Sequence, residues 1–189
     1  FGDTIRRGDI FTLAESAQTD PDAALTLLWT SLAWGSGTRR RNNKRRIKSV
    51  AADKTWAGEH LMKAATLSRE DPAKAYAWLY PDHRGAIPWL GPAFFTKYLY
   101  FAGGGSAEHP CVILDVNVAR ALHESCGWKS LPVEKGGWNA TAYGNYCKLL
   151  GGWVDQPYGI ARRDVIERWL FEEGKRLAPQ PKRRQRTAR

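Results

Sequence analysis

The chain has 189 residues, 43% of them hydrophobic, which suits one compact domain or two small lobes around a cleft. The formal net charge of +10 favours a polyanionic partner, with simple solubility as the alternative explanation. No segment reads as a signal peptide or is apolar over a length that spans a membrane. The sequence therefore predicts a cytoplasmic protein without a membrane partner.

The potential metal ligands of the chain are scattered. Cys111, Cys126 and Cys147 are odd in number and widely spaced, with no CxxC pair and no four-cysteine set for an iron–sulfur cluster. We interpret them as free, mostly buried thiols in a reducing compartment. The four histidines contain no pair at helical metal-binding spacing. We therefore expect no catalytic metal and no cofactor.

Helical signals dominate the chain, and the only strand-like run, Val112–Leu114, is too short to build a sheet. Asp20 and Pro21 form an N-cap followed by proline at the first helical position, and apolar residues then recur at helical spacing. Further helices are expected over about 50–67, from Pro72 to near Pro81, from Pro92 to about Ala102, from Asp115 onwards, near 140–150 and over 164–177. The predicted fold is all-α, a two-lobed helical bundle.

Two basic segments interrupt this pattern. Residues 39–46 hold six cations and no acid, which predicts a loop on DNA phosphates; a merely solvated loop is the alternative. The candidate DNA contacts in this run are Arg39, Arg40, Arg41, Lys44 and Arg45. Five further cations follow Pro179 and Pro181. We therefore expect a folded domain over 1–178 and a disordered basic tail over 179–189 that can contact DNA.

The segment from Pro72 to Ala102 reads as helix, tight turn, helix, and its turn resembles the helix-hairpin-helix motif, usually Leu-Pro-Gly-Val-Gly. In that motif, backbone amides and the positive helix end hold a DNA phosphate. The resemblance implies DNA contacts at Trp89, Leu90 and Gly91. Trp89 replaces the first glycine of the motif, so it alters the turn or acts as a wedge or stacking surface. An ordinary hairpin in a helical bundle is the alternative.

The residues after the turn resemble DNA glycosylases of the helix-hairpin-helix superfamily, and over Ile87–Leu122 they resemble bacterial proteins with the 8-oxoguanine DNA glycosylase fold. These enzymes place a catalytic aspartate about twenty residues beyond the hairpin, at the start of a helix, where Asp115 lies here. Its carboxylate would stabilise positive charge at C1′ of the deoxyribose or activate a nucleophile. An aspartate before a helix also serves as a plain N-cap, and one residue can do both.

Bifunctional members of the superfamily use a lysine that attacks C1′ and forms a Schiff base. The usual position is Ala93 here, and Lys97 lies one helical turn further on, as in the archaeal 8-oxoguanine glycosylases that this segment resembles. An aromatic, apolar setting would desolvate Lys97, lower its pKa and free the amine. The alternative is a lysine that reaches solvent or binds phosphate.

A flipped base needs a stacking surface, and we select Trp34 and Trp153 as candidates because each adjoins a glycine-containing loop. Asp164 is interpreted as part of a capping box with Glu167 at a helix start, and not as a second catalytic carboxylate. The resemblance also allows one structural monovalent cation on carbonyls of the hairpin.

These observations predict a monomeric, nucleoid-associated DNA glycosylase acting on double-stranded DNA that carries a modified base, either monofunctional or with β-lyase activity. The candidate substrates are 8-oxoguanine and a hypermodified phage base such as glucosylated hydroxymethylcytosine, the second in antiviral defence. A non-catalytic helix-hairpin-helix DNA-binding module and an RNA-binding helical protein are the alternatives. The Lys97 and Asp115 pair favours the enzyme.

Overall fold

The computed structural model describes residues 4–37, 42–133, 138–154 and 162–179, and every regular element in these ranges is a helix. The all-α prediction is confirmed for this part of the chain. The helices are α1 (Arg7–Phe11), α2 (Pro21–Ser36), α3 (Asn43–Ala52), α4 (Lys54–Glu70), α5 (Pro72–Leu79), α6 (Pro92–Phe101), α7 (Val116–Glu124), α8 (Ala140–Val154) and α9 (Arg163–Arg176), with short 3₁₀ helices at Ser16–Gln18 and Pro81–His83.

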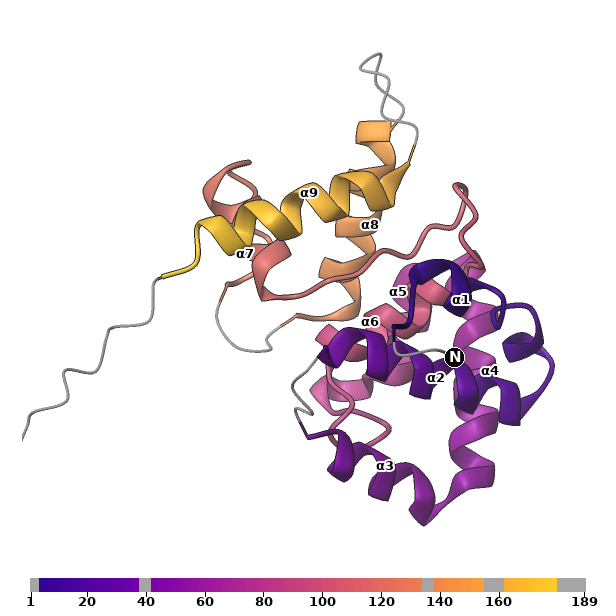
Figure 1. Cartoon of the computed structure of the whole chain (residues 1–189). Helices are drawn as coiled ribbons and strands as arrows, with labels where there is room; N and C mark the ends of the chain where they lie inside the picture. The colour runs from indigo at the N-terminus through magenta and orange to yellow at the C-terminus, as the bar shows by residue number, and fades with distance from the viewer. Residues whose placement is uncertain (1–3, 38–41, 134–137, 155–161, 180–189) are drawn as a thin grey trace, which may run out of the picture.

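The helices form two lobes (Figure 1). In the larger lobe, α2 packs against α4 and α6, and α1 and α3 lie at its edges. In the smaller lobe, α7 packs against α9, and α8 supports them. The lobes are joined by the contact of α5 with α8 and by the extended chain between α6 and α7. None of the described helices is both long and apolar enough to cross a membrane.

Aspartates cap the starts of four helices. The side chains of Asp20, Asp53, Asp71 and Asp115 each accept a hydrogen bond from a backbone amide two or three residues later. Such a cap satisfies amides that have no partner within the helix. The predicted helix starts at Asp20, Asp71 and Asp115 are confirmed.

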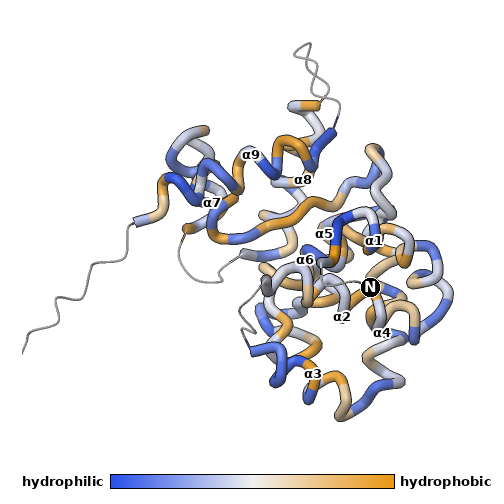
Figure 2. The backbone as a smooth tube through the Cα atoms, in the orientation of Figure 1, coloured by the Kyte–Doolittle hydropathy of each residue, from blue (hydrophilic) through white to orange (hydrophobic). Residues whose placement is uncertain are grey.

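The prediction of one helix over 50–67 is wrong, because Asp53 ends α3 and caps α4. The prediction of a loop over 39–46 is also wrong where the chain is described, since Lys44 and Arg45 lie in the first turn of α3. Figure 2 shows this hydrophilic start of α3 at the lower edge of the larger lobe. Residues 38–41 and 180–189 lie outside the described residues, so the predictions for Arg39, Arg40, Arg41 and most of the basic tail concern that part of the chain.

The strand-like run Val112–Leu114 is extended but pairs with no strand among the described residues. Side chains of α8 bond to its backbone carbonyls instead. The Tyr143 hydroxyl donates to the Val112 carbonyl and the Tyr146 hydroxyl to the Ile113 carbonyl, both at 2.9 Å. Both tyrosines are fully buried. The smaller lobe thereby fixes the chain that leads into Asp115.

Candidate active site

A large open cavity lies between the two lobes. Its volume is about 1120 Å³, and its walls come from the end of α2, the turn before α6, one face of α6, the start of α7 and one face of α9. Lys97 and Asp115 both line it. The structure thus brings together the two residues that the sequence singled out for chemistry, which lie on different elements.

Thr96 fixes the position of Asp115 relative to Lys97. The buried Thr96 hydroxyl accepts a 3.1 Å hydrogen bond from the Leu114 amide and lies 3.2 Å from the Leu114 carbonyl. Thr96 adjoins Lys97 on α6, and Leu114 directly precedes Asp115. This buried contact joins α6 to the chain that leads into α7, so the backbone at Lys97 and the backbone at Asp115 are fixed relative to each other at the cavity.

The side chain of Lys97 follows a narrow path out of α6. Its amine donates a hydrogen bond to the Ala93 carbonyl and lies 5.7 Å from the centre of the Phe94 ring. A Cβ atom placed on Gly35 would lie 2.7 Å from the Cδ of Lys97, which is closer than real Cβ contacts allow. Gly35 therefore makes room for the lysine to pass α2 and reach the cavity.

Asp115 is an N-cap that also faces the cavity. Its Oδ1 accepts hydrogen bonds from the amides of Asn117 at 2.9 Å and Val118 at 3.2 Å. These bonds orient the carboxylate at the positive end of α7. Asp115 is therefore the N-cap of α7, and this structural role is compatible with a chemical one.

The turn before α6 is built around Trp89. The Leu90 amide donates to the Ile87 carbonyl at 3.1 Å, Pro88 occupies the second position, and Trp89 in the third has a φ of 69°. A type II turn has this pattern and normally places glycine third, so a bulky residue there costs roughly 1–3 kcal/mol. Trp89 is nonetheless 54% exposed and lines the cavity. The chain keeps an exposed indole at a position where glycine would be less strained.

The residues around this turn divide into exposed and buried ones. Gly91 is the N-cap of α6, and among the described residues no side chain accepts a hydrogen bond from the first backbone amides of this helix. Leu90 as a whole residue is 2% exposed and packs in the core, and it does not line the cavity. Of the predicted DNA contacts in the turn, Trp89 and Gly91 line the cavity.

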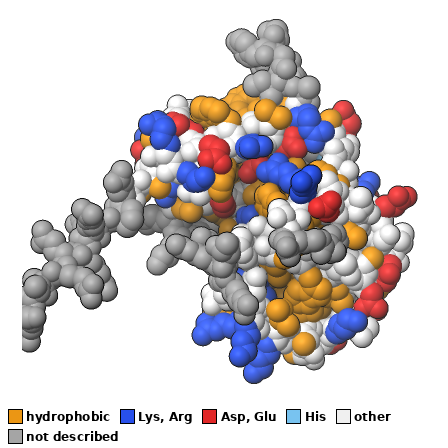
Figure 3. All heavy atoms as spheres, viewed as in Figure 1, with side chains coloured by type: hydrophobic (Ala, Val, Ile, Leu, Met, Phe, Trp, Pro, Cys, Tyr) orange, Lys and Arg blue, Asp and Glu red, His pale blue; other side chains and the backbone are white. Residues whose placement is uncertain are grey.

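The start of α3 supplies positive charge beside the turn. Lys44 and Arg45 are exposed, and the Arg45 guanidinium lies 4.4 Å from the centre of the Trp89 ring. Arg46 is buried, and it donates a 2.9 Å hydrogen bond to the Trp89 carbonyl and lies over the Phe94 ring. Figure 3 shows Lys and Arg side chains gathered at this foot of the larger lobe.

The two candidate stacking residues are placed differently. Trp34 lines the cavity, with its ring edge-on to Phe101 and 5.2 Å from the Arg7 guanidinium. Trp153 is half-buried against the core and is not part of the cavity wall. Trp138 lines the cavity instead, 4% exposed, with its indole N–H donating to the Pro132 carbonyl. The aromatic residues among the described lining of the cavity are thus Trp34, Trp89, Phe94, Trp138 and Phe171.

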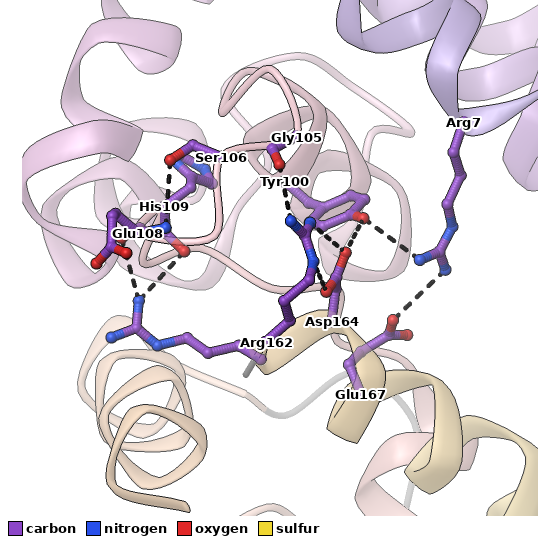
Figure 4. A network of polar contacts seen from close by, with 10 residues as sticks. Arg7, Tyr100, Gly105, Ser106, Glu108, His109, Arg162, Asp164 and Glu167 are labelled. Atoms are coloured by element: carbon purple, nitrogen blue, oxygen red, sulfur yellow. Dashed lines mark hydrogen bonds and ion pairs between the residues drawn. The ribbon is translucent and has the colours of Figure 1, made fainter. Parts of the chain in front are cut away.

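A polar network crosses from the larger lobe to α9 beside the cavity (Figure 4). Arg7 of α1 donates to the Tyr100 hydroxyl at 3.3 Å, and Tyr100 donates to Asp164 at 2.9 Å. Arg162 forms two 2.9 Å bonds to the Asp164 carboxylate. The capping-box interpretation of Asp164 is therefore wrong: the N-cap is Arg162, no side chain caps this helix, and Asp164 is held by Arg162 and Tyr100.

Glu167 is the second acid of this network, and unlike Asp164 it lines the cavity. It is 3% exposed, and its Oε2 lies 3.6 Å from an Arg7 nitrogen without receiving a hydrogen bond from any described residue. Burial raises its pKa to about 7, partly offset by Arg7 and Lys97, with the charges of Asp115 and Asp164 raising it further. Near neutral pH, Glu167 is thus present in both its protonated and its ionised form.

From the raised pKa of Glu167 we predict how the free energy of unfolding depends on pH. The folded protein binds a proton at Glu167 that the unfolded chain releases near pH 4.5, so the free energy of unfolding falls as pH rises from about 4.5 to about 7. Glu167→Gln removes this loss and should be more stable than the wild type at pH 8 by up to about 3 kcal/mol. Urea unfolding of both proteins at pH 5 and pH 8 measures it, and an advantage that does not grow with pH would contradict it.

Sequence reasoning missed Arg7, Gly35, Trp138 and Glu167 as cavity residues. The signal for Glu167 was present: together with Leu170 and Gly174 it forms the buried stripe of α9, where a carboxylate is unexpected unless it is paired or functional. The other three carry no local signal, because a cavity wall is assembled from distant segments.

The family model described as "Putative 8-oxoguanine DNA glycosylase OGG-like protein" matches residues 2–171, which include both lobes and every described cavity residue except Glu172. No curated protein and no solved structure gives a significant match. With nearly its whole length matched, the chain belongs to this OGG-like DNA glycosylase family.

Proposed function

We propose that the protein excises a modified base from double-stranded DNA after the nucleotide has been flipped into the cavity. The observation that carries this proposal is that Lys97 and Asp115 line the same cavity, with their chain neighbours Thr96 and Leu114 joined by a buried hydrogen bond. A base in a duplex is inaccessible to such groups, so an enzyme of this class must take it out of the stack. The ring of Trp34, which is partly exposed in the cavity wall, gives the flipped base a surface to stack on.

Binding is assigned to the turn and to the start of α3. The turn acts as a helix-hairpin-helix element, in which amides near Gly91 and the positive end of α6 hold a phosphate. Lys44 and Arg45 add contacts to neighbouring phosphates. The exposed Trp89 ring, which the Arg45 guanidinium contacts, is suited to insert into the duplex and occupy the space that the flipped nucleotide leaves. A monovalent cation bound by the carbonyls of the turn would have a structural role there, beside the Arg46 guanidinium that donates to the Trp89 carbonyl.

The chemistry is assigned to Asp115 and Lys97. Cleavage of the bond between the base and C1′ gives the sugar positive charge, and the Asp115 carboxylate stabilises that charge. The Lys97 amine attacks C1′ and forms a covalent adduct, which then allows β-elimination of the strand. If Lys97 does not attack, Asp115 activates a water molecule and the protein is a monofunctional, monomeric glycosylase.

The substrate is a base with a bulky or oxidised modification. The open cavity, at about 1120 Å³, is slightly larger than the roughly 300–1,000 Å³ of usual ligand pockets. This size suits a glucosylated hydroxymethylcytosine, found in phage DNA, at least as well as 8-oxoguanine.

The test is a panel of matched duplexes that carry 8-oxoguanine, glucosylated hydroxymethylcytosine, hydroxymethylcytosine or only normal bases. Each is incubated with the protein, and released base is measured by chromatography while binding is measured by fluorescence anisotropy. We expect release from one modified duplex and none from the unmodified one. Tight binding to every duplex with no release would instead support the non-catalytic DNA-binding module.

A further inference from the structure

Among the described residues, Glu167 is the buried acid of the cavity wall, and the roles proposed for Lys97 and Asp115 do not involve it. We propose that Glu167 is the general acid of the excision reaction and delivers a proton to the base as the bond to C1′ breaks. This inference rests on the glycosylase function proposed above and goes beyond it, because neither Lys97 nor Asp115 supplies that proton.

Glu167 lies at the wall of the cavity that would hold the base, and a small rotation of its side chain would bring the carboxyl group into contact with that base. The residue lines the same cavity as Lys97 and Asp115, and its Oε2 is buried without a hydrogen-bond partner among the described residues. A buried acceptor without a hydrogen bond costs about 1–3 kcal/mol, which the Arg7 nitrogen at 3.6 Å offsets only in part, so this oxygen is available to a ligand or a reacting group. A base nitrogen that arrives in the cavity would complete its hydrogen bonding.

Charged groups from four segments act on Glu167, and the titratable hydroxyls of Tyr100 on α6 and Tyr146 on α8 also lie near it. Arg7 of α1 and Lys97 of α6 favour the carboxylate, while Asp115 before α7 and Asp164 on α9 favour the protonated form. Burial is the largest influence and raises the pKa to about 7. A proton-transfer group is most effective when its pKa lies near the working pH, because both forms are then available.

The proton inventory of the step balances without a further reagent. As the bond from C1′ to the base nitrogen breaks, its electron pair remains on the base, and the Glu167 carboxyl proton neutralises that pair. The bond that replaces it forms between C1′ and the Lys97 nitrogen, which must then lose a proton. The Glu167 carboxylate, steadied by Arg7, accepts this proton and is ready for another cycle.

The test is the pH dependence of base release under single-turnover conditions, using the duplex that the wild type cleaves best. The wild-type rate should fall as pH rises above about 7, because Glu167 ionises. Glu167→Gln should release base roughly 100-fold more slowly or worse, without that fall, while still binding the duplex. Glu167→Asp should keep the fall at a reduced rate. Glu173→Gln, on the same helix but outside the cavity, is the matched control and should behave as the wild type.

The outcomes separate this proposal from the function on which it rests. If the wild type releases base and Glu167→Gln does so at a similar rate with the same fall above neutral pH, Glu167 is not the acid. A slower Gln variant that retains the fall would show that Glu167 only positions the base, which also overturns the proposal. If the wild type releases no base from any duplex, the glycosylase function itself fails.

Discussion

Asp115→Asn is expected to slow base excision by roughly 10³-fold while DNA binding and stability stay near those of the wild type. Asparagine caps a helix about as well as aspartate, so its side-chain oxygen can still accept the hydrogen bonds from Asn117 and Val118. Only the negative charge beside C1′ is lost. Single-turnover base release, duplex affinity and thermal unfolding, measured on the same preparation, separate these effects.

The chain provides a matched control in Asp71. Asp71 caps α5 with the same pair of hydrogen bonds, to Ala73 and Lys74, and it does not line the cavity. Asp71→Asn should therefore leave excision unchanged. If the two variants behave alike in all three measurements, Asp115 is a cap alone, and the role assigned to it is wrong.

Lys97→Gln is expected to abolish the covalent adduct that borohydride traps between the protein and a cleaved duplex. The adduct needs a primary amine at C1′, and glutamine has none. Lys97→Arg extends the test, because arginine keeps the positive charge and its phosphate affinity but cannot form a Schiff base. Gel electrophoresis of the trapped complexes measures the adduct, and strand cleavage by β-elimination should disappear in both variants.

Lys74→Gln serves as the control for this experiment, since Lys74 is an exposed lysine on α5 away from the cavity. It should form as much adduct as the wild type. An adduct that persists in Lys97→Gln would assign the amine to another residue. Base release by the wild type without any adduct would make the enzyme monofunctional, with Asp115 activating water.

Local patterns allowed much of the fold to be predicted. Asp20, Asp71 and Asp115 each precede an apolar helical period, and each caps the helix that was expected there. The break at Asp53 was missed because apolar residues continue on both sides of it, which hides a cap inside an apparently continuous period. Val112–Leu114 looked strand-like because it is apolar, but tyrosine hydroxyls from α8 take the place of a neighbouring strand.

The cavity could be predicted only in part. Lys97 and Asp115 follow a recognisable order along the chain, and the structure places both in one wall. Trp153 and Trp138 have similar local surroundings in sequence, and only the packing of the lobes decides which one reaches the cavity. Glu167 was interpreted as a capping residue because the pattern from Asp164 fits a capping box, whereas the N-cap is Arg162, two residues earlier, and Glu167 lies on the buried face of α9 at the cavity.

The most direct test of the central claim is the mass of both DNA strands after incubation of the wild type with the best-bound modified duplex. The proposed function predicts that the strand carrying the modification loses the mass of that base, leaving either an abasic site or the products of β-elimination. The complementary strand should be unchanged. Two unchanged strands, at protein concentrations that saturate the duplex, would contradict the claim and identify the protein as a DNA-binding member of its family.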